Sequence, residues 1–476
     1  PLVSSSAASD VYKRQKKFFQ MNDIKKIHLI GIGGAGMSGI AEILINLDYE
    51  ISGSDLVDTP ITQRLESLGA EIFYAHDASN VAEKDLVVIS SAISNENLEV
   101  SEAEKLKIPV IKRAEMLANL MMLKESVAIA GSHGKTTITC ILAHIFSSNE
   151  LDPTYIIGGK VESFASNAKL GKGKHIFTEA DESDGSFLLL RPHKAVIANI
   201  DNDHLEAYDD SLEKLKQSFK DFCLKTPFQG RIFANGDSPE VVEVIENLPR
   251  NVSLFGFSAN NDFQILNFMQ DKDGSNFVLF DKEKNNKMSF KTNMLGKHNI
   301  LNAAAAITVA LDEGISYEGI KQALEKFIVI ERRFQLISEK VFEKDIILID
   351  DYGHHPEELS VSINTVKEVW PNRKLLVVFQ PHRYSRTKAL FDDFVRLLSS
   401  CENLILLEIY PASEKPIPNY ESDDLIREIH KLNPSAKLVR GIEEAYDAMK
   451  EIAEDNFIFL TQGAGNTSLL AKKFKN

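Results

Sequence analysis

The chain of 476 residues has no run of about 18 consecutive apolar residues, the length that a membrane-spanning helix requires. It also has little cysteine. Cys140, Cys223 and Cys401 are too few and too scattered for a disulfide framework or a cysteine-based zinc site. Three small buried side chains in a reducing cytoplasm explain them more simply.

Basic side chains are also in deficit. The chain has 54 Lys and Arg residues against 69 Asp and Glu residues, a formal net charge of −15. An acidic surface repels the phosphate backbone of nucleic acids, so we expect no nucleic-acid partner. A small anionic ligand is still compatible with this charge, because backbone amides and a few cations can hold it locally.

What is present is the composition of a folded protein, with 43% hydrophobic and 26% charged residues. At about 150 residues per domain, the length predicts roughly three domains. Residues 1–20 are rich in Ser and Ala and then basic, without the apolar segment or cleavage site of a secretory signal. We therefore expect residues 1–20 to be extraneous to the fold or disordered.

Short apolar strands alternate with helical patterns through the rest of the chain. Residues 27–30, 127–130 and 346–349 are examples of such strands. This alternation is typical of an α/β fold with mostly parallel sheets and flanking helices. Residues 250–292 differ, because their short strands and turn residues suggest antiparallel strands appended to the second sheet.

The first glycine-rich loop, residues 31–36 (Gly-Ile-Gly-Gly-Ala-Gly), follows a strand and opens a helix. Its glycines let backbone amides approach a pyrophosphate at the helix N-terminus. Asp55, at the end of the next strand, is placed to hold a ribose. The pattern by itself fits NAD or any other nucleotide diphosphate.

A second loop, residues 131–137 (Gly-Ser-His-Gly-Lys-Thr-Thr), has the same strand-to-helix context. Its amides would cradle phosphates, Lys135 would reach the terminal phosphates, and the Thr136 hydroxyl could bind Mg²⁺. We expect the loop to be exposed and the helix behind it not to need the Lys135 ammonium. Ile129 stands where the general phosphate-loop pattern has its first glycine, so a chance turn is the alternative. Two such loops in one chain predict two phosphate-bearing ligands, whereas a plain dehydrogenase needs one.

Acidic segments follow two strands of the same block. Residues 179–184 (Glu-Ala-Asp-Glu-Ser-Asp) and 199–204 (Asn-Ile-Asp-Asn-Asp-His) stand at strand ends that we expect to be neighbours. Carboxylate oxygens are ligands that Mg²⁺ prefers. Each segment alone could be a solvated loop, but behind a phosphate loop they favour a metal site.

The third block has two further polar segments, at strand ends that we expect to be adjacent: residues 350–356 (Asp-Asp-Tyr-Gly-His-His-Pro) and 380–387 (Gln-Pro-His-Arg-Tyr-Ser-Arg-Thr). Arg383 and Arg386 could form a guanidinium fork for a carboxylate. A solvated surface pair is the alternative. A second aromatic and histidine-rich strand end in one sheet favours the binding site.

Together with residues 296–299 (Gly-Lys-His-Asn) and 331–334 (Glu-Arg-Arg-Phe), these motifs occur in order from about residue 21 to the end, and the set resembles the Mur ligases. Within that family, the 350–356 and 380–384 motifs are similar to those of the member that joins L-alanine to UDP-N-acetylmuramate. A related ligase that adds another amino acid or a peptide is the alternative.

The resemblance implies an ATP- and Mg²⁺-dependent amide-bond synthesis in cytoplasmic peptidoglycan assembly, through an acyl phosphate, by a monomer or weak homodimer away from membranes. It implies a Rossmann-like UDP-sugar domain (21–122), a central ATP domain like a phosphate-loop ATPase (123–335) and a Rossmann-like amino-acid domain (336–476).

Residue roles follow from the matching motif positions. The UDP-sugar positions are Gly31, Gly33, Gly34, Ala35, Gly36, Asp55 and Ser91. The ATP positions are Gly131, Ser132, His133, Gly134, Lys135, Thr136, Thr137, His298, Asn299 and Arg333. The metal positions are Thr136, Glu179 and His204, and the L-alanine positions are Tyr352, His354, His382, Arg383 and Arg386. The catalytic positions are Lys135, Glu179, His204 and His354.

The sequence departs from the family pattern near its C-terminus. Asn466 replaces the usual Asp after Gly-Ala-Gly, and Ser413 replaces Gly after Tyr-Pro-Ala. Two rival classes also stay open. An NAD dehydrogenase leaves the second loop unexplained, and a nucleotide-binding switch without catalysis leaves the third block's Arg and His cluster unexplained.

Overall fold

The computed structural model describes residues 24–94, 96–158, 166–328, 330–412 and 414–474. The segment 1–20, expected to be extraneous, lies outside them. The chain divides into two compact units. The first comprises the chain up to residue 267 with 277–290 and 301–327, and the second comprises 268–276, 291–300 and the chain from 328 onward.

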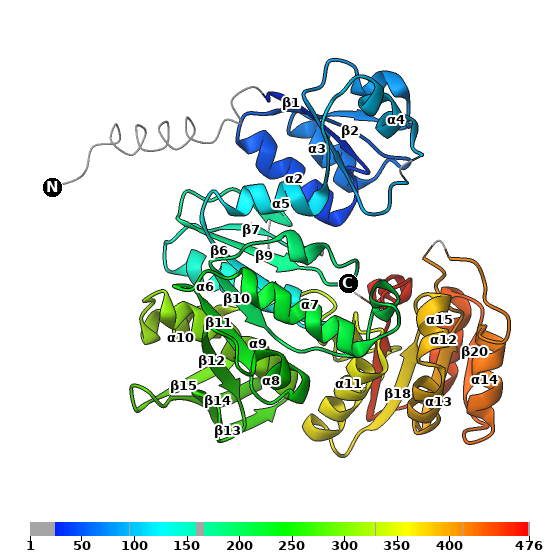
Figure 1. Cartoon of the computed structure of the whole chain (residues 1–476). Coiled ribbons are helices and arrows are strands. Elements are labelled where there is room, and N and C mark those ends of the chain that lie inside the picture. The colour runs from blue at the N-terminus through cyan, green and yellow to red at the C-terminus, as the bar shows by residue number, and fades with distance from the viewer. Residues whose placement is uncertain (1–23, 95, 159–165, 329, 413, 475–476) are drawn as a thin grey trace. The chain divides into compact units, whose positions relative to one another are not determined.

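The first sheet has five parallel strands in the order β3-β2-β1-β4-β5 (blue in Figure 1). Side chains of β1 pack alternately on its two faces, Ile27 and Leu29 into one apolar cluster and Ile30 into another. Burial on both faces explains the continuous apolar run, as expected for a parallel sheet. The elements are β1 (Lys26–Ile30), α2 (Ala35–Asn46), β2 (Glu50–Ser54), α3 (Pro60–Ser67), β3 (Glu71–Phe73), η1 (Ala78–Val81), β4 (Leu86–Ile89), α4 (Leu98–Lys105), β5 (Val110–Lys112) and α5 (Arg113–Met121).

The second sheet has ten strands in the order β15-β14-β13-β12-β11-β10-β6-β9-β7-β8. Strand β6, which leads into the second glycine loop, pairs in parallel with both β9 and β10. The expectation that the two acidic strand ends are neighbours is therefore wrong, because β6 is inserted between them. The strands are β6 (Glu125–Ala130), β7 (Thr154–Ile156), β8 (Ala168–Lys169), β9 (His175–Ala180), β10 (Lys194–Ile197), β11 (Arg231–Asn235), β12 (Asn251–Gly256), β13 (Phe263–Asp271), β14 (Gly274–Asp281) and β15 (Asn286–Thr292).

The region 250–292, which was expected to be antiparallel, begins with a parallel strand. Strand β12 pairs in parallel with β11 and with β13, so the antiparallel prediction is wrong for β12. The helical elements of this part of the chain are α6 (Lys135–Ser148), η2 (Ser186–Leu189), η3 (Leu205–Tyr208), α7 (Leu212–Lys225), α8 (Pro239–Ile245), α9 (Lys297–Asp312) and α10 (Tyr317–Lys326).

The third sheet, in the second unit, has the order β16-β17-β21-β18-β19-β20 and is parallel except for β16. Strand β21, from the end of the chain, is inserted between β17 and β18. The elements, yellow to red in Figure 1, are β16 (Gln335–Ser338), β17 (Ile346–Asp351), α11 (Pro356–Val369), β18 (Lys374–Phe379), α12 (Tyr384–Ala389), α13 (Phe391–Ser399), β19 (Asn403–Leu407), α14 (Ser422–His430), β20 (Lys437–Val439), α15 (Ile442–Ile452), β21 (Phe457–Gln462) and α16 (Thr467–Lys472).

The predicted fold class is confirmed: three mostly parallel sheets with flanking helices. The boundaries near 122 and 335 stay a prediction, and the first two predicted domains fall largely in one compact unit. Among the described residues, no helix has the length and apolar character needed to cross a membrane.

Candidate functional site

The second glycine loop connects β6 to α6 and has a backbone that requires glycine. Gly131 and Gly134 have φ values of +144° and +84°. A Cβ on Gly134 would lie 2.5 Å from the Asn302 side-chain oxygen. Sequence reasoning missed Asn302, which comes from α9 and packs against this turn.

The end of β10 fixes the shape of this loop. The His133 backbone N–H donates to Asn199 Oδ1 at 2.8 Å, and Asn199 Nδ2 donates back to the His133 carbonyl at 3.1 Å. The Asp201 N–H donates to Ser132 Oγ at 2.9 Å. The phosphate-loop backbone is therefore preorganised by residues about 66 positions further along the chain.

Lys135 begins helix α6, and its ammonium is hydrogen-bonded inside the protein. Its Nζ lies 2.8 and 3.0 Å from the two carboxylate oxygens of Glu182 and 2.6 Å from the Gly131 carbonyl. Burial lowers the pKa of Lys135, but the carboxylates of Glu182, Asp181 and Glu179 outweigh burial and raise it. The Lys135 side chain is only 14% exposed, so the expectation that it stands on an exposed loop is wrong.

Acidic and histidine side chains lie at the ends of the two strands that flank β6. Glu179 and Asp181 lie at and just after the end of β9, and Asp201 and His204 follow β10. Glu179 Oε1 accepts a hydrogen bond from the Gly158 N–H at 2.9 Å. Burial raises the pKa of Asp181, but Lys135 and hydrogen bonds from Ser183 outweigh burial and lower it, so this carboxylate is ionised at neutral pH.

This donor set fits a hard cation. Thr136 in the first turn of α6 and Glu179 supply oxygen ligands, which Mg²⁺ prefers, and His204 adds one nitrogen. His204 has a left-handed backbone, with φ of +56°, and its Nε2 lies 3.5 Å from Asp203 Oδ2. The metal assignment of these three residues stays a prediction.

Among the described residues, one group of His, Cys, Asp or Glu side chains has metal-like geometry, with ligand atoms within 4.8 Å of one another: Glu125, His175 and Glu313. Lys174 Nζ lies 2.8 Å from Glu125, and Lys194 Nζ donates to Glu313. Ammonium groups already neutralise these carboxylates, so this cluster is an ion-pair network.

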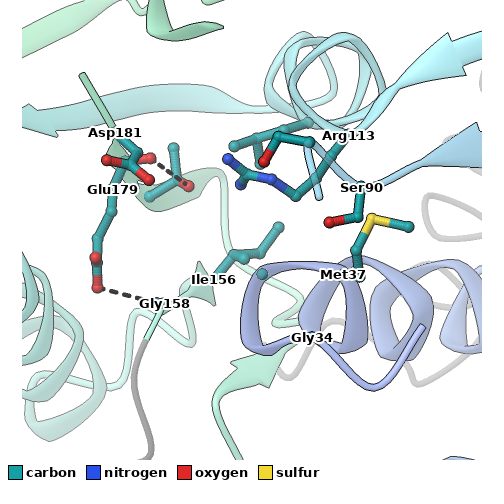
Figure 2. A pocket seen from close by; sticks show the side chains of 12 residues that line it. Gly34, Met37, Ser90, Arg113, Ile156, Gly158, Glu179 and Asp181 are labelled. Atoms are coloured by element: carbon teal, nitrogen blue, oxygen red, sulfur yellow. Dashed lines mark hydrogen bonds between the residues drawn. The ribbon is translucent and has the colours of Figure 1, made fainter. Parts of the chain in front are cut away.

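A pocket of about 240 Å³ connects the first glycine loop to the acidic end of β9. Figure 2 shows the Arg113 side chain between Ser90 on one side and Asp181 with Glu179 on the other. A Cβ on Gly36 would lie 3.0 Å from Arg113 Nη1, so the guanidinium packs against the glycine loop. The pocket lining is Gly34, Gly36, Met37, Ser90, Ser91, Arg113, Leu117, Ile156, Gly158, Thr178, Glu179 and Asp181.

Arg113 is the functional candidate that sequence reasoning missed in this pocket. The available signal was a basic residue directly after β5, at the first position of α5. A guanidinium that lines the same pocket as the first glycine loop and Glu179 can pair with an anionic ligand.

The first glycine loop is bound to the end of β2. Gly31 and Ile32 donate backbone hydrogen bonds to the Ser54 carbonyl at 2.8 and 3.1 Å. The Gly33 N–H donates to Asp55 Oδ2 at 2.9 Å, and a Cβ on Gly33 would lie 2.7 Å from that oxygen. The side chain of Ala35 lies outside the described part of the chain. The UDP-sugar assignment of this loop stays a prediction.

In the second unit, three of the residues predicted to bind the amino acid lie together, at the strand ends on either side of β21. The ring centroids of Tyr352 and His354 are 5.7 Å apart, as are those of His354 and His382. His382 also stacks on Tyr410, with the two ring centroids 5.4 Å apart. Sequence reasoning gave Tyr410, the first residue of the Tyr-Pro-Ala segment, no role. The expectation that 352 and 382 follow adjacent strands is wrong, because β21 lies between β17 and β18.

The two arginines lie close to His382. Arg383 is the N-cap residue before α12, with φ of +70°, and it donates its N–H to the Tyr410 carbonyl at 2.8 Å, while Arg386 is buried. Burial and then the Arg386 and Arg383 charges lower the pKa of His382 to about 4. His382 is therefore neutral at pH 7. The fork on a carboxylate stays a prediction.

The predicted ATP residues are divided between the units. Residues 131–137 belong to the first unit, and His298, Asn299 and Arg333 belong to the second. Burial lowers the pKa of His298 to about 4, and its buried Nδ1 atom has no hydrogen-bond partner among the described residues. The Arg333 guanidinium lies 5.1 Å from the Tyr352 ring centroid. Arg333 is a predicted ATP residue and Tyr352 a predicted L-alanine residue, so the two predicted sites are in contact in this unit.

Comparison with known proteins identifies the family. The Mur ligase family catalytic domain matches residues 26–125, the Mur ligase middle domain matches 129–310, and the Mur ligase glutamate ligase domain matches 332–465. The chain belongs to the Mur ligase family.

Individual relatives refine this result. A UDP-N-acetylmuramate–L-alanine ligase of Psychrobacter sp. is 42% identical over 462 residues, 97% of each chain. The crystal structure of UDP-N-acetylmuramate-alanine ligase MurC from Thermotoga maritima aligns with a TM-score of 0.78 and 27% identity, covering 94% of this chain and 98% of that one. A murein peptide ligase from Psychrobacter arcticus, with a TM-score of 0.68, 21% identity and coverage of 94% and 98%, shares the fold.

Proposed function

We propose that this Mur ligase joins L-alanine to UDP-N-acetylmuramate with ATP, in cytoplasmic peptidoglycan precursor synthesis. The observation that carries the proposal is the near full-length identity of 42% to a ligase of that name. The motifs of the third block, with Tyr352, His354 and His382 clustered at one sheet edge, support the amino-acid side of the proposal.

The reaction begins at the phosphate loop. A muramoyl carboxylate oxygen attacks the γ-phosphorus of ATP, and ADP leaves with the bond electrons, so that an acyl phosphate forms. The Lys135 ammonium and the loop amides stabilise the charge that the transferring phosphoryl group carries. Mg²⁺ bound by Thr136, Glu179 and His204 would supply further positive charge at this point.

The sugar nucleotide is held at the first glycine loop. The amides at the N-terminus of α2 bind the pyrophosphate, because the N–H groups of Gly31, Ile32 and Gly33 already donate to Ser54 and Asp55. Asp55 binds the ribose. Arg113, in the pocket with Glu179, is placed to hold an anionic part of the same substrate.

The second step uses the amine of alanine. The amine attacks the acyl carbon, the tetrahedral intermediate expels phosphate, and the amine loses a proton as the amide forms. Arg383 and Arg386 hold the amino acid's carboxylate, and His354 with Tyr352 orients the amine. His382 is neutral at pH 7, so it can accept a hydrogen bond from the incoming amine.

One assay tests the proposal. Phosphate release from ATP is measured with UDP-N-acetylmuramate across L-alanine, serine, glycine and the tripeptide L-alanyl-γ-D-glutamyl-meso-diaminopimelate. We expect the highest kcat/KM with L-alanine. Preferred turnover of the tripeptide would instead assign the chain to the peptide-adding ligases, and turnover with neither would refute the proposal. The proposal includes no nucleic-acid or membrane partner and a monomer or weak homodimer.

A further inference from the structure

A buried carboxylate lies behind the first glycine loop, outside the set of proposed ligand contacts. Glu99, in the first turn of α4, has a fully buried side chain. Its Oε1 accepts from Asn80 Nδ2 at 2.8 Å and from His28 Nε2 at 3.3 Å. Its Oε2 accepts from Ser54 Oγ and from His76 Nδ1, both at 2.7 Å. A carboxylate has about four acceptor positions, so all of them are used.

The four donors keep Glu99 ionised. Burial raises its pKa, but the hydrogen bonds from His28, Ser54, Asn80 and His76 outweigh burial and lower the pKa to about 2. Because a carboxylate only accepts, each histidine nitrogen that faces it carries a hydrogen. The other ring nitrogen of His28 lies 2.9 Å from Ser52 Oγ.

This network meets the glycine loop at one residue. The Ser54 side chain donates to Glu99, and the Ser54 carbonyl accepts the N–H groups of Gly31 and Ile32. The next residue, Asp55, accepts the N–H of Gly33. A shift at the end of β2 would therefore move the loop amides and the Asp55 carboxylate together.

We propose that Glu99 is a positioning residue of the sugar-nucleotide site: through Ser54 and His76 it fixes the end of β2, and with it the glycine loop and Asp55. The inference rests on the proposed function, because it assigns a support to the UDP-sugar side of that reaction. A role confined to folding would instead lower stability and leave substrate affinity unchanged.

The test is Glu99→Gln in the full chain. Glutamine keeps the shape, but its amide NH₂ faces donors where the carboxylate accepted. We expect the KM for UDP-N-acetylmuramate to rise about tenfold or more, because small displacements of binding groups are costly. We expect kcat and the KM for ATP to stay within about twofold, since the second loop is held by Asn199 and Asp201.

Two control variants come from the same helix. Val100→Ala removes part of a buried apolar side chain that contributes to a separate cluster, so it lowers the melting temperature without touching Ser54. Glu102→Gln changes a carboxylate that pairs with Lys105, outside the hydrogen-bond network of Glu99. Both should keep the wild-type KM for the sugar nucleotide.

Ser54→Ala provides a second route if Glu99→Gln does not fold. It removes one donor to Glu99 and keeps the Ser54 carbonyl, and we expect UDP binding, measured by calorimetry, to weaken severalfold. The inference would be overturned if Glu99→Gln had the same KM for UDP-N-acetylmuramate as Val100→Ala at matched stability. Unchanged UDP affinity in Ser54→Ala would also overturn it. Absence of turnover in the wild-type chain would refute the proposed function itself and the inference with it.

Discussion

Lys135 and Glu182 form a buried ion pair, with the ammonium nitrogen 2.8 and 3.0 Å from the two carboxylate oxygens. Glu182 is itself fixed, since the Tyr208 hydroxyl donates to its backbone carbonyl. The phosphate-loop lysine is therefore aligned by the acidic segment after β9. In the proposed reaction, the ATP phosphates and Glu182 would share or exchange the Lys135 ammonium.

Lys135→Ala should abolish turnover, because a cation aimed at a transferring phosphoryl group is worth on the order of a few kcal/mol in the transition state. It should also destabilise the fold by about 3 kcal/mol, because it leaves Glu182 buried without its partner. Phosphate release and urea unfolding measure the two effects.

The double variant Lys135→Met with Glu182→Gln is the control. We expect it to recover most of the stability and none of the turnover. Near-wild-type activity in either variant would refute the phosphate-loop assignment.

Gly33→Val should weaken sugar-nucleotide binding. Its Cβ would lie 2.7 Å from the Asp55 carboxylate, so the hydrogen bond between Gly33 and Asp55 could not persist. Steady-state kinetics should show a raised KM for UDP-N-acetylmuramate and a much smaller change for ATP.

Gly69→Ala is the control for a glycine replacement away from the proposed site. Gly69 has φ of +103°, and no atom lies within 4 Å of an added Cβ, so this variant should change only stability. Equal effects of Gly33→Val on both substrates, or hydride transfer to NAD by the wild-type chain, would contradict the assignment.

Arg383→Lys should raise the KM for L-alanine by about tenfold or more, since lysine lacks the planar fork that matches a carboxylate. The KM values for ATP and the sugar nucleotide should be nearly unchanged. Arg396→Lys, at an exposed pair with Asp393, is the matched control. Loss of sugar-nucleotide affinity with an unchanged alanine KM would mean that this edge binds something else.

Asp351→Asn should alter how stability depends on pH. Burial and then the Glu358 charge raise the pKa of Asp351 from 3.8 to about 6. Between pH 4 and 6 the folded chain keeps a proton that the unfolded chain has lost, so the Asp351 contribution to stability falls as pH rises through this window.

Asparagine does not titrate, so the free energy of unfolding of Asp351→Asn relative to wild type should increase by on the order of 2–3 kcal/mol between pH 4 and pH 7. Urea unfolding at several pH values measures this difference, and other titrating groups cancel in it. A relative stability that decreases with pH would show that the Asp351 pKa is lowered in the folded chain.

Local features of the site were predictable from the sequence. Each glycine loop is a contiguous strand–turn–helix segment whose chemistry depends on neighbouring residues, so 31–36 and 131–137 fold as expected. The clustering of Tyr352, His354 and His382 also followed from strand ends that share one sheet edge.

Strand order and distant partners were not predictable in the same way. Inserting β6 between β9 and β10, or β21 between β17 and β18, depends on pairings between remote segments, which strand composition does not encode. The Lys135–Glu182 pair joins residues 47 positions apart, and Arg113 packs against Gly36 of the first glycine loop, a remote part of the sequence. Such contacts need the assembled sheets.

The central claim, alanine ligation through an acyl phosphate, has a direct test. The wild-type chain is incubated with ATP, L-alanine and UDP-N-acetylmuramate labelled with ¹⁸O in its carboxylate, and the products are analysed by mass spectrometry. The account predicts ADP, a UDP-N-acetylmuramoyl-alanine that keeps one labelled oxygen, and phosphate that carries the other. Label in AMP, or no alanine conjugate at all, would contradict it.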